Sequence, residues 1–292
     1  MKKFYIYISY IAGALLLLLS LSGCRMDNLQ QALSFGERHA GTVDNLFQAS
    51  QGFTPQEEHY LGRAVAAQIL SRYPALNDKK ANDYLNQIGQ ALALCSPQPH
   101  TYGGYHFQLL NSNEVNAFAA PDGLIFVTKG MLRLLANESQ LAAVLAHEIA
   151  HVQNKDAVNA INNARLTSAF SSAGVNAARQ YTPAQVAQLA GAFSDSINEI
   201  VDTLVTKGYA RSQEYAADNA ARKILARAGY DPQALNQVLK TMASAVPQGS
   251  AGFGSTHPSA SARLDELPAG ATPQDEPAVR QNRFRAALGK YL

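Results

Sequence analysis

Two histidines and a glutamate have the spacing H-E-x-x-H at His147, Glu148 and His151. On an α-helix, residues four apart lie one above the other, so both imidazoles can reach a single ion, while Glu148 is rotated by roughly 100° to the edge of that face. Two imidazoles with a neighbouring carboxylate base suit a catalytic Zn²⁺. Such an ion normally takes three protein ligands and keeps one position for water, so a third ligand must lie elsewhere.

The segment that carries this motif has the pattern of a helix. Apolar residues recur there at steps of three and four among alanines, and Asn137 with Gln140 predicts the helix start. The alternative is a chance match on an ordinary helix whose histidines lie at the surface or in the core. The apolar setting favours the metal, because unpaired polar groups are costly to bury.

Glu214 is the next strong candidate for the third ligand, and Asp218 follows one helical turn later. A third histidine of the metzincin kind is excluded, because Asn154 and Ala157 occupy the relevant places. No carboxylate lies around Ser171, where a thermolysin-type ligand is expected. A zinc-facing Glu214 would bring Asp218 within reach of the free N–H of a ligand histidine.

The two carboxylates have a second interpretation. Acidic pairs are common on solvated helix faces, and Arg211 and Arg222 could serve as their partners. Spacing alone leaves this alternative open.

Between residues 105 and 127 the pattern changes to three extended segments separated by turn-forming N-S-N-E and P-D-G. We predict a small antiparallel sheet before the motif helix, and hence a mainly helical α+β fold. The segment V-N-A-F-A is our candidate for an edge strand to which an extended substrate adds through main-chain hydrogen bonds. An ordinary core strand is the alternative. After the motif helix, Thr182-Pro183 opens a predicted amphipathic helix with an apolar stripe from Val186 to Leu204.

Four linked motifs carry a family resemblance: V-N-A-F-A-A-P-D-G-L-I-F-V-T-K-G-M-L, H-E-I-A-H, R-S-Q-E-Y-A-A-D and T-H-P-S-A-S-A-R. In this order, between Thr54 and Leu267, they resemble the HtpX-like family of gluzincin metallopeptidases, whose relatives include CAAX prenyl proteases and periplasmic lipoprotein peptidases. The resemblance implies a zincin-like catalytic domain with one Zn²⁺ per chain, general-base catalysis by Glu148, and three zinc ligands, which are His147, His151 and Glu214.

The resemblance also implies roles around the metal. Asp218 would orient a ligand histidine, and the substrate cleft would be lined by Asn116, Ala117, Phe118 and Ala119. His257 could stabilise the oxyanion or occupy the open zinc position and hold the enzyme latent, whereas the plainer interpretation is a turn histidine before a proline. Arg263 would position this loop or bind the substrate main chain.

The amino terminus has the pattern of a bacterial lipoprotein signal. Lys2 and Lys3 precede an apolar run that closes in L-S-G-C, which resembles a lipobox ending at Cys24. We therefore divide the chain into a signal peptide (1–23), a lipidated tether (24–53), a peptidase domain (54–270) and a carboxy-terminal tail (271–292). Arg25 after the cysteine favours the outer membrane, with the protein facing the periplasm. An uncleaved membrane anchor is the alternative.

The charge balance gives no support for nucleic-acid binding. Loss of the signal removes two of the 24 basic residues and none of the 22 acidic ones, so the remaining chain is neutral.

These observations predict a zinc metalloendopeptidase in which Glu148 activates a water molecule, acting on unfolded or misassembled envelope proteins. The alternative is a periplasmic chaperone or assembly factor for outer-membrane proteins with a latent or structural zinc site. A cell-wall hydrolase is disfavoured, because no wall-binding repeat is visible.

Overall fold

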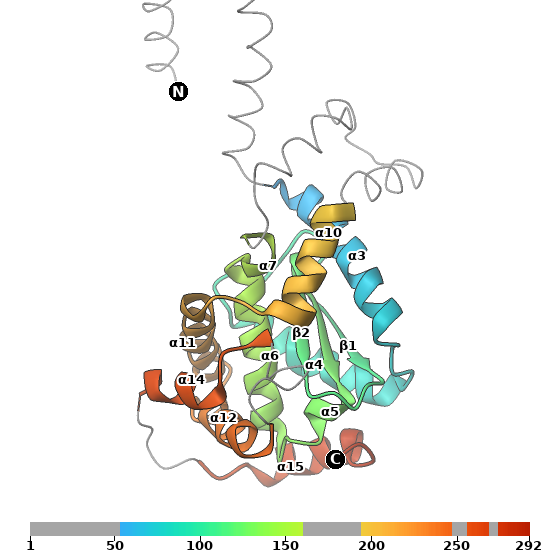
Figure 1. Ribbon diagram of the computed structural model, residues 1–292. Helices are drawn as coiled ribbons and strands as arrows, with labels where there is room; N and C mark the ends of the chain where they lie inside the picture. The colour runs from blue at the N-terminus through green and yellow to red at the C-terminus, as the bar shows by residue number, and fades with distance from the viewer. Residues whose placement is uncertain (1–52, 160–193, 247–255, 269–273) are drawn as a thin grey trace, which may run out of the picture. The chain divides into compact units, whose positions relative to one another are not determined.

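Three strands form one mixed sheet in the computed structural model, which describes residues 53–159, 194–246, 256–268 and 274–292 (Figure 1). The strands β1 (His106–Leu110), β2 (Ala117–Ala120) and β3 (Leu124–Thr128) lie in the order β1-β3-β2. β2 pairs with β3 antiparallel, as predicted, whereas β1 runs parallel to β3. Side chains alternate with period two in either direction, so the sequence pattern does not distinguish the two pairings.

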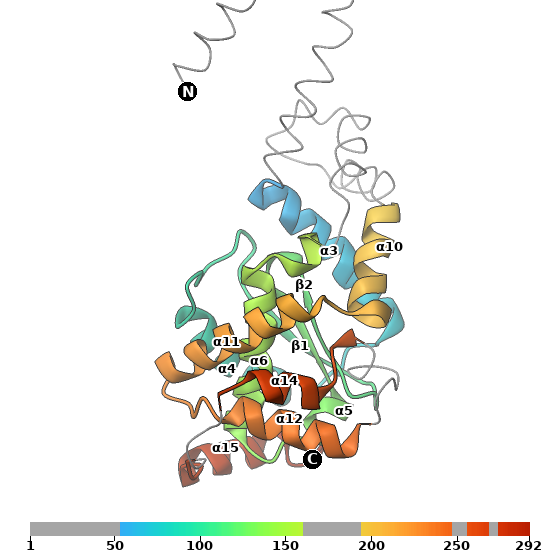
Figure 2. The same ribbon diagram turned by 60° about the vertical axis from the view of Figure 1, so that its left-hand side comes forward.

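This alternation divides the sheet between two apolar clusters. Ile125 and Val127 face the cluster that contains α4 (Lys79–Leu94) and α6 (Glu138–Gln153). Phe118 and Phe126, one position out of phase, belong to the cluster that contains α3 (Pro55–Arg72) and α10 (Ser194–Asp202). Figures 1 and 2 show α3 and α10 side by side along the sheet. The predicted amphipathic stripe is buried where it is described, at Ile197, Val201 and Leu204, and residues 182–193 lie outside the described part.

The motif helix α6 lies between the sheet and a second group of helices, which contains α11 (Arg211–Arg227), α12 (Ala234–Ala245) and α14 (Ala260–Glu266) (Figure 1). The remaining elements are α5 (Lys129–Leu132), α7 (Asp156–Asn159), α15 (Ala278–Leu288), the 3-10 turn η1 (Pro121–Gly123) and the π-helical turn η2 (Thr203–Lys207). This arrangement buries α6 almost completely, as its alanine-rich sequence requires.

The predicted start of the motif helix is confirmed. The Asn137 side chain accepts a hydrogen bond from the Gln140 amide at 2.9 Å and begins α6. Thr54 and Glu57 form a reciprocal capping box at the start of α3, with Pro55 in the first turn. At the other end of α6, Lys155 adopts a left-handed conformation with φ of 55°, which turns the chain back toward the helix.

The carboxy-terminal segment, predicted as a tail, contains helix α15. Its Phe284 and Leu288 are fully buried in the same core as α6. The proposed signal peptide and all but the last residue of the tether lie outside the described residues. Within the part that is described, no helix has both the length and the apolarity needed to cross a membrane.

Candidate metal centre

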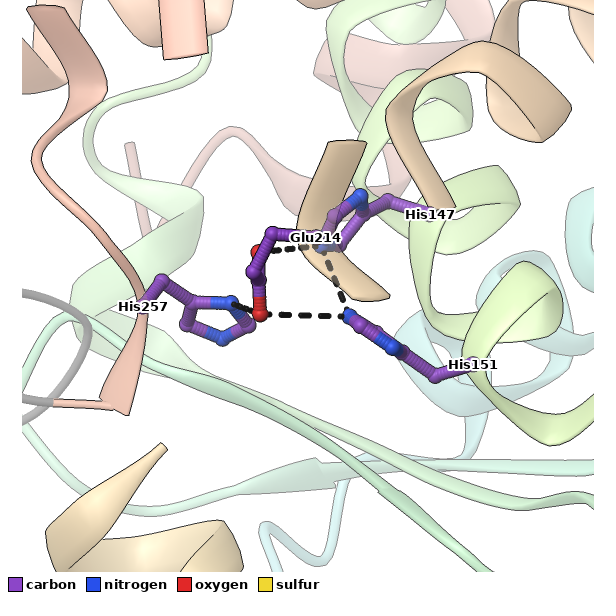
Figure 3. A group of neighbouring side chains, drawn as sticks. All are labelled: His147, His151, Glu214 and His257. Carbon is purple, nitrogen blue, oxygen red and sulfur yellow. Dashed lines mark hydrogen bonds and ion pairs between the residues drawn. The ribbon is translucent and has the colours of Figure 1, made fainter. Parts of the chain in front are cut away.

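α6 presents His147 and His151 toward the same point, as the spacing predicts. Their Nε2 atoms lie 3.0 Å apart, and the two rings stand nearly perpendicular (Figure 3). Nδ1 of His147 lies 3.0 Å from Oδ1 of Asp218, so the Asp218 carboxylate contacts the side of the ring that is turned away from His151. Both Nε2 atoms are therefore available to a common partner.

α11 brings Glu214 against both histidines. Its Oε2 lies 3.4 Å from Nε2 of His147, and its Oε1 lies 3.6 Å from Nε2 of His151. Glu214 and Asp218 are 0% and 1% exposed, so the alternative of a solvated acidic helix face is excluded.

His257 meets Glu214 from the opposite side, on the segment that precedes α14 (Figure 3). Its Nδ1 lies 2.8 Å from Oε1 of Glu214. The four side chains each offer a ligand atom, and these atoms lie within 4.8 Å of one another in a fully buried group made of His147, His151, Glu214 and His257. The sequence thus predicted all four members, although they come from three separate segments.

This donor set fits a metal ion of the zinc kind. Imidazole nitrogens and one carboxylate are ligands that Zn²⁺ prefers. Two imidazole nitrogens that face each other at 3.0 Å need a proton or a cation between them. Oε1 of Glu148 is buried without a hydrogen-bond partner among the described residues, as expected of a base whose partner is a solvent or substrate proton.

The local charges also favour a cation. Burial opposes ionisation of Glu214, but His257, His147 and Arg263 hold the pKa of its carboxyl well below the usual range. Burial would lower the pKa of His147, as would Arg263, yet hydrogen bonds to Asp218 and Glu214 raise it to about 9. The two carboxylates therefore favour a positive charge beside them. A bound metal ion can provide that charge in place of the proton on His147.

Arg263 is built into this centre rather than exposed beside it. Its Nε donates to Oδ2 of Asp218 at 2.9 Å, and Nη1 lies 3.4 Å from Oε2 of Glu214. Burial opposes ionisation of Asp218, but Arg263 and then His147 lower the pKa of its carboxyl. The side chain of Arg263 thereby holds the two carboxylates of α11 in place; its predicted contact with substrate stays a prediction.

Asp156 was missed by sequence reasoning. Its Oδ2 accepts a hydrogen bond of 2.7 Å from Nδ1 of His151, and its Oδ1 accepts one of 2.9 Å from Nε2 of Gln213. The left-handed Lys155 makes this contact possible, because it reverses the chain just after α6. An acidic residue three positions after the last residue of the motif helix was the available signal. Each histidine of the motif thus has its own orienting carboxylate.

Tyr209 was also missed. Its ring packs on that of His151, with centroids 4.4 Å apart. Burial, followed by the charges of Glu148, Asp156 and Glu214, raises the pKa of its hydroxyl well above the ordinary value. Nothing in the local sequence marks this tyrosine, which lies between two helices.

The predicted substrate strand, β2, is an edge strand of the sheet, since β3 is its one partner strand in the described part. Phe118 points into the core and packs against Tyr73, so its side chain serves packing.

Asn116 lies directly before β2 and close to Thr256, the residue that precedes His257. Its Oδ1 lies 3.5 Å from the Thr256 hydroxyl. Its Nδ2 is buried and has no hydrogen-bond partner among the described residues. The roles of Asn116, Ala117, Phe118 and Ala119 toward a substrate stay predictions.

A helical domain with an H-E-x-x-H helix beside a small sheet, and a buried histidine and glutamate cluster against that helix, is a zincin-like metallopeptidase fold. Comparison with protein families agrees, because residues 79–270 match Peptidase family M48. The chain therefore belongs to Peptidase family M48, and the family resemblance of its motifs is confirmed.

Curated relatives come from bacteria and mitochondria. The beta-barrel assembly-enhancing protease of Escherichia coli (strain K12) is 29% identical over 190 residues, which cover 64% of this chain and 37% of that protein. The mitochondrial metalloendopeptidase OMA1 of Schizosaccharomyces pombe is 31% identical over 52% of this chain and 42% of the relative. A protease HtpX homolog of Aquifex aeolicus is 31% identical, covering 56% and 57%. The chain spans well under half the length of the Escherichia coli relative that it matches.

Proposed function

We propose that this protein is a zinc-dependent metalloendopeptidase, with His147, His151 and Glu214 as metal ligands and Glu148 as general base. The observation that carries this proposal is the buried convergence of the three ligand side chains beside a glutamate whose Oε1 has no hydrogen-bond partner in the described part. A purely structural metal site has no need of such a base. The family membership supports a peptide hydrolase.

In this mechanism, bound Zn²⁺ would supply Lewis acidity toward the scissile carbonyl and lower the pKa of water to roughly 7. Glu148 takes a proton from the attacking water and delivers it to the leaving amine nitrogen. Asp218 and Asp156 hold the two proposed ligand histidines by their Nδ1 atoms, which would leave Nε2 of each ring to hold the ion. Arg263 neutralises the carboxylates that would otherwise repel one another.

His257 is proposed to hold the enzyme in a latent state. It lies as close to Glu214 as a direct hydrogen bond allows and offers a fourth ligand atom to the same point. A metal with four protein ligands has a closed site, whereas catalysis needs one position open. Withdrawal of the His257 segment would open that position. Stabilisation of the oxyanion is the alternative role of His257, and in that role its loss would slow cleavage.

The proposed substrates are unfolded or misassembled proteins of the bacterial envelope, because strand addition at β2 requires an extended segment. We place the protein on the periplasmic side of the outer membrane, anchored by lipid on Cys24. The name of the Escherichia coli relative, a beta-barrel assembly-enhancing protease, agrees with an envelope role.

The test compares the full chain with its Glu148→Gln and His257→Ala variants, measuring bound zinc and cleavage of unfolded casein. We expect stoichiometric zinc in all three. We expect loss of cleavage by at least 100-fold in Glu148→Gln, since removal of a general base typically costs about 10²–10⁴-fold. The His257→Ala variant should cleave faster than the wild type if His257 closes the site.

Each other outcome counts against a named part of the proposal. Loss of zinc in Glu148→Gln would contradict the role of Glu148 as a base rather than a ligand. Zinc without cleavage in the wild type and in His257→Ala would favour the chaperone, in which the metal site is structural.

A further inference from the structure

Tyr209 lies at an unusual junction of the chain. The π-helical turn η2 ends at Lys207, Gly208 follows with φ of 77°, and α11 begins directly after Ala210. A Cβ on Gly208 would lie 2.0 Å from the carbonyl oxygen of Thr256, so the junction is pressed against the segment that carries His257. Single π-helical turns occur frequently at functional sites, and this one sets Tyr209 beside the metal centre.

The Tyr209 hydroxyl is buried, and no residue in the described ranges accepts or donates a hydrogen bond to it. A phenylalanine would give the same ring contact with His151 without a buried polar atom, and an unpaired buried hydroxyl is destabilising. Packing alone therefore does not account for a tyrosine. Glu148, which follows the proposed ligand His147 on α6, also has a buried oxygen without a hydrogen-bond partner among the described residues. A substrate bound at this centre would supply a hydrogen-bond partner for each of these two groups.

We propose that Tyr209 is a further catalytic residue, which donates a hydrogen bond to the oxyanion formed from the scissile carbonyl. In the step that forms this anion, the water oxygen bonds to the carbonyl carbon, the π electron pair of the carbonyl moves to its oxygen, and the water proton goes to Glu148. A phenol donor and a carboxylate base on the same reacting group would stabilise the two changes of charge in one step. This inference rests on the peptidase function proposed above.

The experiment uses Tyr209→Phe in the zinc-loaded full chain, in both the wild-type and the His257→Ala background. Three quantities are measured: bound zinc, kcat and KM for a fluorogenic peptide, and the affinity for a phosphinic peptide that mimics the tetrahedral intermediate. We expect unchanged zinc, KM within about twofold, and a fall in kcat of about 100-fold, as for the loss of one oxyanion donor. The phosphinic peptide should bind more weakly by a similar factor. Tyr215→Phe, which removes a hydroxyl from the partly exposed side of α11, is the matched control and should leave all three unchanged.

An unchanged kcat together with unchanged phosphinic peptide affinity would overturn the assignment. Loss of zinc in Tyr209→Phe would also overturn it, because the hydroxyl would then serve the ion and not the substrate. If wild type and Glu148→Gln prove equally inactive, the peptidase proposal fails by itself. In that case, the affinity for the phosphinic peptide tests the role of Tyr209. Weaker binding to Tyr209→Phe than to wild type would support the Tyr209 hydroxyl as a hydrogen-bond donor, and equal binding would contradict it.

Discussion

At the scale of single residues, two carboxylates orient the histidines that we propose as metal ligands. An imidazole presents Nε2 to a cation reliably when Nδ1 donates to a fixed acceptor. His147 has Asp218 for this purpose, and His151 has Asp156, which is itself tied to Gln213 on α11. The proposed metal centre is therefore held by contacts from α11 as well as α6.

We predict that Asp156→Ala lowers zinc affinity by about 10–100-fold, as is typical when the partner of a ligand histidine is lost. Competition with a chelator of known affinity measures this directly and independently of catalysis. Asp83→Ala, which also removes one carboxylate but from the exposed Lys79–Asp83 pair, is the control and should retain its zinc. Equal affinity in Asp156→Ala and wild type would mean that Asp156 only ends the helix.

At the scale of elements, the junction between η2 and α11 positions both Tyr209 and Glu214. Its backbone conformation at Gly208 combines positive φ of 77° with ψ of 179°, a region that is essentially restricted to glycine. The same residue touches Thr256, so the junction and the His257 segment are packed as one unit. A side chain at this position would disturb both.

We predict that Gly208→Ala lowers the free energy of unfolding by about 2–3 kcal/mol, through backbone strain and the clash with Thr256. Gly229→Ala, at the other end of α11, is the matched control. Gly229 also has positive φ, of 75°, but its nearest neighbour for a Cβ is 3.9 Å away. Gly229→Ala should therefore lower the free energy of unfolding by less, about 1 kcal/mol. Urea denaturation of both variants measures the difference, and equal losses would refute the close packing against Thr256.

At the scale of the whole described domain, Glu138 connects α6 to the rest of the fold. This fully buried carboxylate accepts hydrogen bonds from the hydroxyls of Tyr84 at 2.7 Å and Tyr230 at 2.8 Å, and it pairs with Arg283 of α15. Arg280 lies 3.8 Å away. The carboxy-terminal helix thereby holds the first turn of the motif helix α6, together with the apolar contacts of Phe284.

The pH dependence of stability should report this contact. Burial alone would raise the pKa of Glu138, but hydrogen bonds from Arg283, Tyr84 and Tyr230 bring it below its ordinary value of 4.5. A carboxyl with a lowered pKa in the folded state stabilises the fold above its unfolded pKa and loses that contribution as pH falls through the folded value. We predict that wild type exceeds Glu138→Gln in unfolding free energy at pH 7, and that this gap narrows below pH of about 4. Urea denaturation across this range measures the gap, and a constant gap would contradict the prediction.

The sequence by itself determined the features that depend on neighbours along the chain. The spacing of His147 and His151 on one helix face and the cap at Asn137 act within one or two helical turns, so local rules predicted them correctly. The four family motifs also identified Glu214 and His257 as candidates, although their approach to α6 could be inferred only from resemblance.

Tertiary structure alone decided the features that depend on how distant segments pack. The parallel direction of β1 has the same alternation as the predicted antiparallel one, so only the path of the chain sets it. Glu214 and Asp218 are buried because α11 packs on α6 and because Arg263 of α14 contacts Asp218. This burial excluded the interpretation of a solvated acidic helix face. Asp156 and Tyr209 reach the centre through a left-handed residue and a π-helical turn, and these conformations persist only where surrounding packing stabilises them.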